Sequence, residues 1–329
     1  MSVSNVCRRA RRARRTLLGI GAAIALVGGG MCVVGQSTPP AAAPAKLSLK
    51  TLRARYHLPN SRFATLDQVP VHFTDEGRGP SVVLLHASYL DLTSWDDWAR
   101  NLTRDHRVLR LDRLRFGMTG SYPGNVVDYE HEVKLLEAFV ADRKLHHFTL
   151  VGASSGGMVA ALYAQRHPEM LDTLVLMNFP IGHGRIANAV KPAAPGGAAL
   201  IRLILETNMI DKRPITPALV QRLGDFADRE DEGGAAAASF DKASALTEDD
   251  RIRILRGIRT RTMVLWSAEN RTLPMTAGQA AFDAIGAPHK YLTIIGGAGH
   301  MVPLERGRET AQVVRQFIDG GAAPARVGP

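Results

Sequence analysis

The stretch LVGASSGGMVAALYAQRHP, residues 150–168, joins a short apolar run to a pattern that is typical of a helix. At the junction stands the G-x-S-x-G sequence Gly152-Ala153-Ser154-Ser155-Gly156. In such a junction the central serine sits on a strained strand-to-helix turn, and small neighbours allow the backbone to bend that sharply. The start of the helix then directs N–H groups toward negative charge. The pattern predicts that Ser154 is a nucleophile and that Ser155 offers its backbone N–H to an oxyanion; a turn that only begins a helix is the alternative.

Apolar runs on either side of this stretch alternate with helical patterns, which indicates a largely parallel sheet with helices on both faces. We expect strands at residues 69–74, 81–86, 107–112, 148–152, 172–178, 262–267 and 290–295. DEGRGP, residues 75–80, is expected to form a hairpin-like connection between the first two strands. Between residues 179 and 257 the strand rhythm stops, and helical patches predict a cap over one end of the fold. The expected organisation is a core in two parts, 46–180 and 258–329, with a helical cap at 181–257.

These features resemble the α/β-hydrolase family, in its cap-bearing branch of esterases, lipases and carbon–carbon bond hydrolases, over roughly residues 60–320. VVLLHASYLDLTSW, residues 82–95, resembles the family's strand that ends in His-Gly. The resemblance implies that Ser88 supplies the second oxyanion N–H and that His86 is a structural residue. Ala87 departs from the family's glycine and adds a methyl group where the backbone can need unusual angles.

A second segment carries the resemblance further. VLRLDRLRFGMTG, residues 108–120, resembles the family's Asp-x-x-Gly-x-Gly segment through Asp112 and Gly117. Here Leu114 and Arg115 replace the usual small turn after the aspartate. The fold class that the resemblance implies is the α/β-hydrolase fold, with a mostly parallel sheet, helices on both faces and a helical cap insertion.

The candidate base is His300. A serine hydroxyl is a poor nucleophile unless an imidazole accepts its proton. Of the eleven histidines, only His300 follows a late strand in a glycine-rich loop, where it can reach Ser154. GGAGHMVPLE, residues 296–305, also resembles the family's Gly-x-Gly-His segment, and the order of serine, acid loop and histidine along the chain is the family's order.

The acid that should orient the histidine is missing from its usual place. In VLWSAENRTLP, residues 264–274, the position that the family gives to the acid holds Asn270. The other common site, at the end of the sixth strand, also holds an amide, Asn178. In a serine-protease triad, replacing aspartate by asparagine lowers turnover about 10⁴-fold. Three alternatives stay open: Glu269 is the acid, Asn270 orients His300 weakly in a slow enzyme, or the chain is a non-catalytic binding protein on this scaffold.

Residues 1–45 have the character of a leader. Six arginines and no acid in the first fifteen residues precede an uncharged apolar run at 17–34. With a small-residue site at Ala43 and Ala45, this arrangement is typical of a secretory signal, and RRTLL at 14–18 also resembles a twin-arginine signal. An uncleaved anchor is the alternative, and membrane contact is then expected only through residues 17–34. Either way, we expect the body to be exported from the cytoplasm, as a periplasmic, secreted or membrane-anchored protein.

The leader also accounts for most of the net charge of +10. Subtracting its six arginines from the 41 basic residues leaves 35, against 31 acidic ones. That balance speaks against nucleic-acid binding by the body. Both cysteines, Cys7 and Cys32, lie in the leader, so the body has no thiolate nucleophile and no cysteine metal site.

We expect an exported serine hydrolase that cleaves a small ester or related carbonyl substrate through an acyl-enzyme intermediate, without a metal or organic cofactor.

Overall fold

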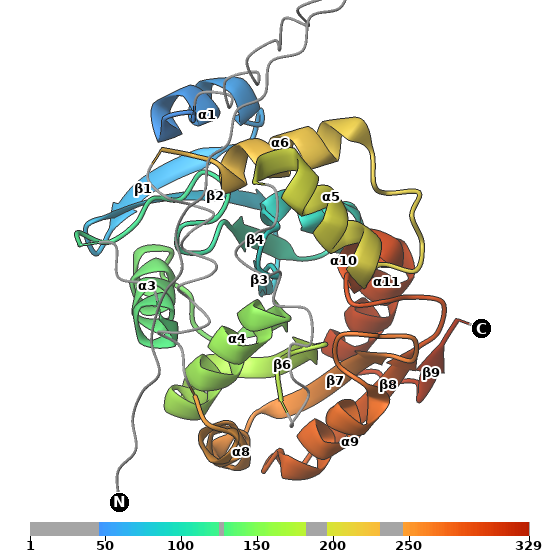
Figure 1. The fold of residues 1–329 in the computed structure, drawn as a ribbon. Coiled ribbons are helices and arrows are strands. Elements are labelled where there is room, and N and C mark those ends of the chain that lie inside the picture. Colours follow the sequence, from blue (N-terminus) through green and yellow to red (C-terminus); the bar gives the residue numbers. More distant parts are fainter. Residues whose placement is uncertain (1–45, 125–127, 182–195, 231–245, 329) are drawn as a thin grey trace, which may run out of the picture. The chain divides into compact units, whose positions relative to one another are not determined.

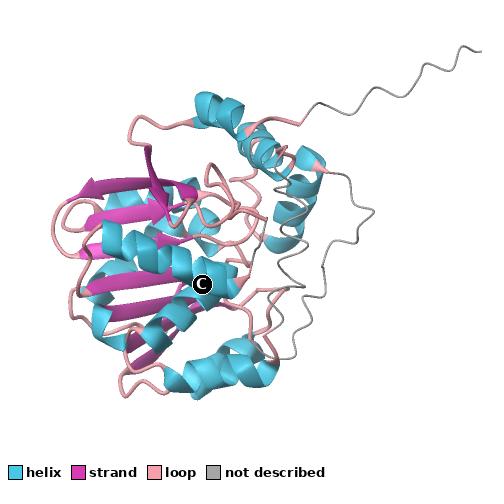
Figure 2. Ribbon diagram, turned by 90° about the vertical axis from the view of Figure 1, so that its left-hand side faces the viewer, coloured by secondary structure: helices cyan, strands magenta, loops and turns pink. Residues whose placement is uncertain are grey.

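The computed structural model describes residues 46–124, 128–181, 196–230 and 246–328, which build a nine-stranded sheet with helices on both faces (Figure 2). The strands are β1 (Arg62–Leu66), β2 (Val69–Gly77), β3 (Ser81–Leu85), β4 (Arg107–Leu111), β5 (Phe148–Ala153), β6 (Leu171–Met177), β7 (Arg261–Ser267), β8 (Lys290–Ile295) and β9 (Arg326–Val327). All seven expected strands are present, and the fold is the α/β-hydrolase fold that the sequence predicted. The short strands β1 and β9 were not expected.

The strand order is β1-β2-β4-β3-β5-β6-β7-β8-β9. β2 pairs antiparallel with β1 and β4, and all the other neighbours pair in parallel. The expected hairpin-like connection at 75–80 is wrong, because β4 lies between β2 and β3. Residues of the expected turn instead continue β2, with Asp75 opposite Leu109 and Gly77 opposite Arg107. The Arg107 guanidinium binds the Asp75 carboxylate through two hydrogen bonds of 2.8 and 2.7 Å, which favours the longer strand.

Helices cover the two faces of the sheet with separate apolar clusters. The helices are α1 (Leu49–Tyr56), α2 (Asp96–Leu102), α3 (Tyr129–Asp142), α4 (Ser155–Arg166), α5 (Gly197–Asn208), α6 (Pro217–Ala227), α8 (Glu248–Gly257), α9 (Met275–Ala284), α10 (Val302–Glu305) and α11 (Gly307–Ile318), with 3₁₀ turns η1 (Leu92–Trp95) and η2 (Pro168–Met170). Side chains of α3, α4, α8 and α9 pack on one face, and those of α2 and α11 on the other. Trp95 and Trp98 are fully buried in the second cluster, with ring centroids 4.9 Å apart.

Helices α5 and α6 form a hairpin beyond the carboxyl ends of the strands (Figure 1). Their apolar side chains join α1 and the turns after β3 and β8, through residues such as Leu90 and Met301, in a third cluster. α8, which falls within the range predicted for the cap, instead packs on α4 and α9. The rest of that range, 182–195 and 231–245, lies outside the described residues. Of the range predicted for the cap, the described part that lies beyond the carboxyl ends of the strands is therefore the α5–α6 hairpin.

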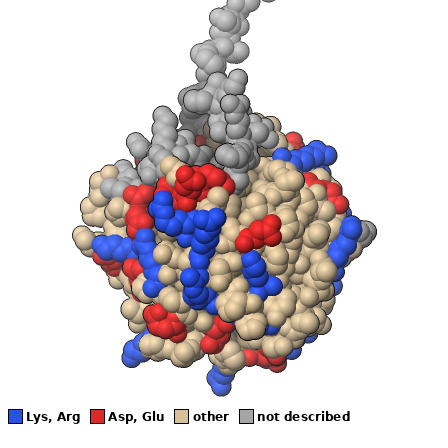
Figure 3. Space-filling model, turned by 90° about the horizontal axis from the view of Figure 1, so that it is seen from below, with Lys and Arg blue, Asp and Glu red and all other residues tan. Residues whose placement is uncertain are grey.

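The predicted leader, residues 1–45, lies outside the described residues. None of the helices in the described ranges has the length and apolar character needed to cross a bilayer. On the face that Figure 3 shows, both basic and acidic side chains lie among neutral ones.

Candidate active site

Ser154 occupies the turn between β5 and α4 with backbone angles φ 52° and ψ −126°. Such angles are strained for a residue other than glycine. A Cβ atom at Gly152 would lie 2.4 Å from the carbonyl oxygen of Gly156, and one at Gly156 would lie 2.6 Å from that of His86. Neither position has room for a side chain, which explains both glycines of the pattern. The turn places the Ser154 hydroxyl at the carboxyl edge of the sheet.

The structure brings His300 to Ser154. His300 follows β8, and its Nε2 lies 2.9 Å from the Ser154 Oγ. The residue is 8% exposed, and burial lowers the pKa of its imidazole from 6.5 to about 4. The imidazole is therefore neutral near pH 7, and no carboxylate of the described residues raises its pKa.

Asn270 contacts the other ring nitrogen. Its Nδ2 lies 3.2 Å from Nδ1 of His300. Its Oδ1 accepts hydrogen bonds of 3.0 Å from the backbone N–H groups of Thr272 and Leu273. Because a backbone N–H can only donate, these two bonds fix which end of the amide is the oxygen. The amide nitrogen, a donor, therefore faces His300.

This orientation sets the tautomer of the imidazole. Nδ1 of His300 accepts from Asn270, so the ring proton is carried on Nε2 and donated to the Ser154 Oγ. In that tautomer His300 cannot take the proton of the serine. The opposite tautomer would set two donors against each other and lose a buried hydrogen bond, which costs about 1–3 kcal/mol.

The structure does not bring Glu269 to the histidine. Glu269 is exposed, and its Oε2 accepts a 3.0 Å hydrogen bond from the N–H of Gly297. Asn178, at the end of β6, lies behind the histidine loop instead. Its Nδ2 donates to the carbonyl oxygen of His300 at 3.1 Å and to the Ser267 Oγ at 2.9 Å. Of the two amides, only Asn270 contacts the imidazole.

Ser88 and Ser155 lie together beside the nucleophile. Ser155 is the first residue of α4, where backbone N–H groups have no partner within the helix. The Oγ atoms of Ser88 and Ser155 are 2.7 Å apart, so the turn after β3 meets the start of α4. The positive φ of this turn falls on Tyr89, at 63°, and not on Ala87. The methyl group of Ala87 therefore meets no backbone conformation that requires glycine.

Arg113 and Glu132 form a buried ion pair that the sequence analysis missed. Arg113 follows the strand β4, and Glu132 lies in the first turn of α3. Arg113 also donates to Ser155 and to the carbonyl oxygen of His86. A charged residue directly after Asp112, at the end of an apolar strand, was the one available signal. Its partner could not be read from the sequence because Glu132 belongs to a distant helix.

Glu305 is a second buried residue that the sequence analysis missed. Its carboxylate accepts from the N–H groups of Gly299 and Met301, on either side of His300, at 3.0–3.2 Å. It also accepts from Ile210 at 2.6 Å and Asp211 at 3.1 Å, just after α5. Burial raises the pKa of Glu305, against the effect of these N–H donors. Glu305 thus joins the end of α5 to the histidine loop.

A direct bond reinforces that junction. The N–H of His300 donates to the carbonyl oxygen of Asn208, the last residue of α5, at 2.6 Å. The side chain of Asn208 in turn binds that of Thr272 in the Asn270 loop. The α5–α6 hairpin therefore contacts the loops of both His300 and Asn270.

Ser61, His72 and Asp112 form a second hydrogen-bonded series of serine, histidine and aspartate, away from Ser154. The Ser61 Oγ lies 2.7 Å from Nε2 of His72, whose Nδ1 lies 2.7 Å from Oδ2 of Asp112. The Asp112 carboxylate also accepts from the backbone N–H groups of Leu92 and Met118 at 2.8 and 2.7 Å. His72 and Asp112 are each 1% exposed. This group organises the loops after β3 and β4, and of its three residues only Asp112 could be singled out from the sequence.

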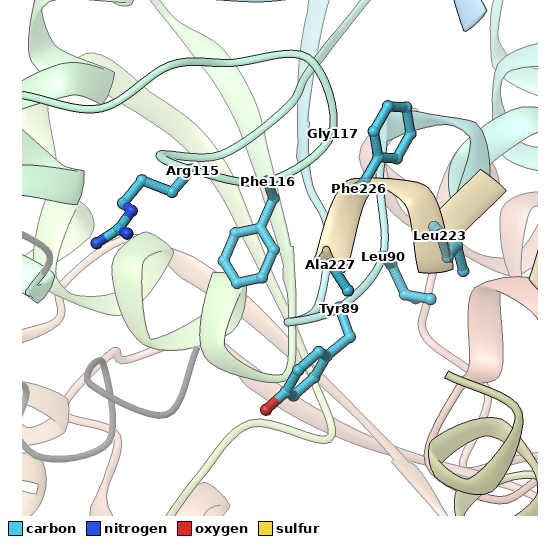
Figure 4. A pocket seen from close by; sticks show the side chains of 8 residues that line it. All are labelled: Tyr89, Leu90, Arg115, Phe116, Gly117, Leu223, Phe226 and Ala227. Atoms are coloured by element: carbon cyan, nitrogen blue, oxygen red, sulfur yellow. The ribbon is translucent and has the colours of Figure 1, made fainter. Parts of the chain in front are cut away.

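An apolar pocket begins next to the oxyanion turn. It is lined by Tyr89, Leu90, Arg115, Phe116, Gly117, Leu223, Phe226 and Ala227 (Figure 4). Arg115, at φ 65°, occupies the position of the small turn that the family shows, and its guanidinium points away from the other lining side chains. Among the described residues, no group of three histidine, cysteine, aspartate or glutamate side chains could hold a metal ion.

The sequence of this chain is similar to those of known proteins. A family model for the alpha/beta hydrolase family matches residues 82–313. The 2-hydroxy-6-oxo-2,4-heptadienoate hydrolase of Pseudomonas putida is 26% identical over 76% of this chain and 93% of its own. The 2-hydroxy-6-oxononadienedioate/2-hydroxy-6-oxononatrienedioate hydrolase of Escherichia coli strain K12 is 25% identical over 78% and 95%.

A solved structure agrees at the level of the fold. The chain is similar to a thermophilic esterase from Thermogutta terrifontis with a TM-score of 0.65 and 23% identity, covering 79% of this chain and 98% of the other. The family match spans well over half of the sequence and includes both Ser154 and His300. The chain belongs to the alpha/beta hydrolase family.

Proposed function

We propose that the protein is a serine hydrolase that cleaves a small ester or related carbonyl substrate through an acyl-enzyme intermediate. The observation that carries the proposal is the 2.9 Å contact between Nε2 of His300 and the Oγ of Ser154, on a strained turn at the start of α4. The relatives' names support the reaction class: two describe hydrolases of oxo acids and one an esterase. Both classes of substrate offer a carbonyl carbon to a nucleophile.

In the proposed reaction the Ser154 Oγ attacks the carbonyl carbon while its proton passes to Nε2 of His300. The N–H groups of Ser88 and Ser155 stabilise the oxyanion that forms. When the bond to the leaving group breaks, His300 returns the proton to that group, and the acyl group stays on Ser154. Water then attacks the acyl-enzyme with the same proton transfers and releases the acid.

Asn270 makes this reaction slow. Before His300 can accept a proton on Nε2, its own ring proton must move to Nδ1, where the Asn270 amide is also a donor. Alternatively the amide must turn and give up its two backbone bonds to Thr272 and Leu273. Either change precedes the chemistry and adds to its barrier, and within the described ranges no carboxylate contacts the imidazolium that forms.

The apolar pocket supports a substrate with an apolar acyl group. It begins one residue after Ser88, and Leu223 and Phe226 of α6 form its far wall. Its volume of about 10 Å³ is roughly the space of one water molecule. Binding of an acyl chain there therefore requires the α5–α6 hairpin or the lining side chains to move.

A fluorophosphonate probe tests the proposal. We expect it to label Ser154 covalently, and Ser154→Ala to abolish the label in a folded protein. Ser155→Ala should weaken labelling but keep it. Ser61→Ala is the matched control, because Ser61 also contacts a histidine and yet should leave labelling unchanged. No label on the folded wild type, or a label that survives Ser154→Ala, would contradict the assignment.

A second candidate function is a non-catalytic binding protein on the same scaffold. It is favoured by one observation, the amide donor of Asn270 that holds His300 in the tautomer unable to accept the serine proton. The test uses short-chain aryl esters and 2-hydroxy-6-oxo-2,4-heptadienoate, the compound in the name of the Pseudomonas putida relative. If the folded wild type neither takes the label nor hydrolyses any of them, this second function is the better account.

We further propose that residues 1–45 export the protein from the cytoplasm. The support is the contiguous arginine block and apolar run of the sequence. Fractionation of a tagged full-length chain in a bacterium should find the protein outside the cytoplasm. A stable cytosolic pool with an intact N-terminus would contradict export.

A further inference from the structure

A buried ion pair lies directly behind the nucleophile turn. Nε and Nη2 of Arg113 donate to Oε2 and Oε1 of Glu132 at 2.9 and 2.7 Å, and the two side chains are 1% and 2% exposed. Removing two charges from water is costly, and apolar residues of similar volume often give equal or greater stability. The pair therefore has no clear advantage as a stabilising contact alone. The remaining contacts of Arg113 point to another role.

Those contacts reach both sides of the oxyanion site. Nη1 of Arg113 donates to the carbonyl oxygen of His86 at 2.9 Å and to the Ser155 Oγ at 2.7 Å. The backbone N–H of Arg113 also donates to Nε2 of His86 at 3.0 Å. His86 comes two residues before Ser88 at the end of β3, and Ser155 begins α4. One guanidinium thus holds the two segments whose N–H groups face the oxyanion.

The chemistry of the guanidinium fixes the direction of the first hydrogen bond in a chain of two. A guanidinium N–H can only donate, so the Ser155 Oγ accepts from Arg113. The Ser155 Oγ is also hydrogen-bonded to the Ser88 Oγ, which lies 2.7 Å away. These bonds therefore link Arg113, Ser155 and Ser88 in one chain. Bonds to a charged donor are shorter and stronger than neutral ones, which stiffens the first link.

We propose that Arg113 is a positioning residue for the oxyanion hole: held by Glu132, it sets the spacing of the Ser88 and Ser155 N–H groups through their side chains. The inference rests on the proposed function and deepens it. Because the oxyanion exists only in the transition states and intermediates, a displaced donor lowers kcat and leaves KM nearly unchanged. Removing one oxyanion donor costs about 10²–10³ in kcat, so loosening two is expected to cost about 10-fold to 100-fold.

The test compares three variants on a short-chain aryl ester. Arg113→Met with Glu132→Leu removes the pair without leaving an uncompensated charge. Ser155→Ala removes the middle link and only one oxygen atom, so it keeps the test decisive if the double variant does not fold. The triple variant combines them. We expect each to lower kcat about 10-fold to 100-fold with KM within about two-fold, and the triple variant to be no slower than the slower of the two, because all interrupt one chain.

A second ion pair provides a matched control. Arg107 binds Asp75 with the same two-bond geometry, at 2.8 and 2.7 Å, but joins β2 to β4 away from the nucleophile. Arg107→Met with Asp75→Asn should change thermal stability and leave kcat unchanged.

The outcomes separate the inference from the proposed function. An active wild type with unchanged kcat in the folded variants overturns the positioning role alone. Effects that multiply in the triple variant, or that fall on KM instead of kcat, also overturn it. A wild type that neither takes the fluorophosphonate label nor turns over overturns the proposed function and the positioning role together.

Discussion

The amide nitrogen of Asn270 lies 3.2 Å from Nδ1 of His300, and the two backbone bonds to its oxygen fix that nitrogen as a donor. A carboxylate at the same position could keep both backbone bonds on one oxygen and accept from Nδ1 with the other. The site therefore has the geometry of a catalytic triad, except that the atom facing Nδ1 of His300 is a hydrogen-bond donor and not an acceptor.

Asn270→Asp is accordingly expected to raise esterase turnover. The carboxylate would hold the His300 proton on Nδ1, leave Nε2 free to accept from Ser154 and stabilise the imidazolium. The upper bound on the gain is about 10⁴ in kcat, the loss seen for the reverse change in a serine-protease triad. Initial rates on a short-chain aryl ester at pH 8 measure it. Glu269→Gln is the control and should leave the rate unchanged, since Glu269 binds Gly297; a collapse of turnover there would make Glu269 the acid.

The same substitution should shift the acid limb of the pH profile. General-base catalysis needs a neutral imidazole, and burial holds the pKa of His300 at about 4. The wild-type kcat/KM should therefore begin to fall only as the pH approaches about 4, as long as the protein stays folded. An aspartate at position 270 favours the charged imidazole and raises its pKa, so kcat/KM of Asn270→Asp should begin to fall at a higher pH. Superimposable acid limbs would contradict this electrostatic account.

Acid should destabilise the fold through two buried histidines. Burial lowers the pKa of both His86 and His300 to about 4, and for His86 the nearby Arg113 adds to the effect. In the unfolded chain both titrate near 6.5, so between pH 6.5 and about pH 4 the unfolded state binds more protons. Stability is therefore lost as pH falls through this window. Tm measured from pH 7 to pH 4 should decline, and His300→Gln should make the decline shallower; an unchanged slope in that variant would exclude His300 as a contributor.

Glu305→Gln should loosen the junction between α5 and the histidine loop. The carboxylate accepts from four backbone N–H groups, and an amide must turn its NH₂ toward some of them. A buried donor left without a partner costs about 1–3 kcal/mol, so we expect a loss of that size in the free energy of unfolding. Denaturant titration measures it. Glu309→Gln on the exposed side of α11 is the control and should stay within about 0.5 kcal/mol of wild type.

Much of the fold could be predicted because its strands are buried on both faces and read as continuous apolar runs. The partner of β2 could not, since pairing with β4 depends on contacts such as Arg107 with Asp75 across a long stretch of chain. The strand-to-helix turn at Ser154 and the position of His300 follow from local patterns, in which glycines come directly after an apolar strand. By contrast, the amide orientation at Asn270 depends on the backbone of the following residues, and the Arg113–Glu132 pair depends on where the first turn of α3 lies relative to the loop after β4. Sequence spacing carries neither kind of information.

The shape of the Asn270 loop has a consequence for the history of the gene. Asparagine and aspartate codons differ only in their first base, so one A-to-G transition separates the present amide from a carboxylate. The backbone bonds to Thr272 and Leu273 would survive that exchange, because the oxygen that accepts them is present in both side chains. A lineage carrying this gene is thus a single nucleotide away from a full triad. Persistence of the asparagine in related genomes would indicate selection for a histidine that accepts protons less readily.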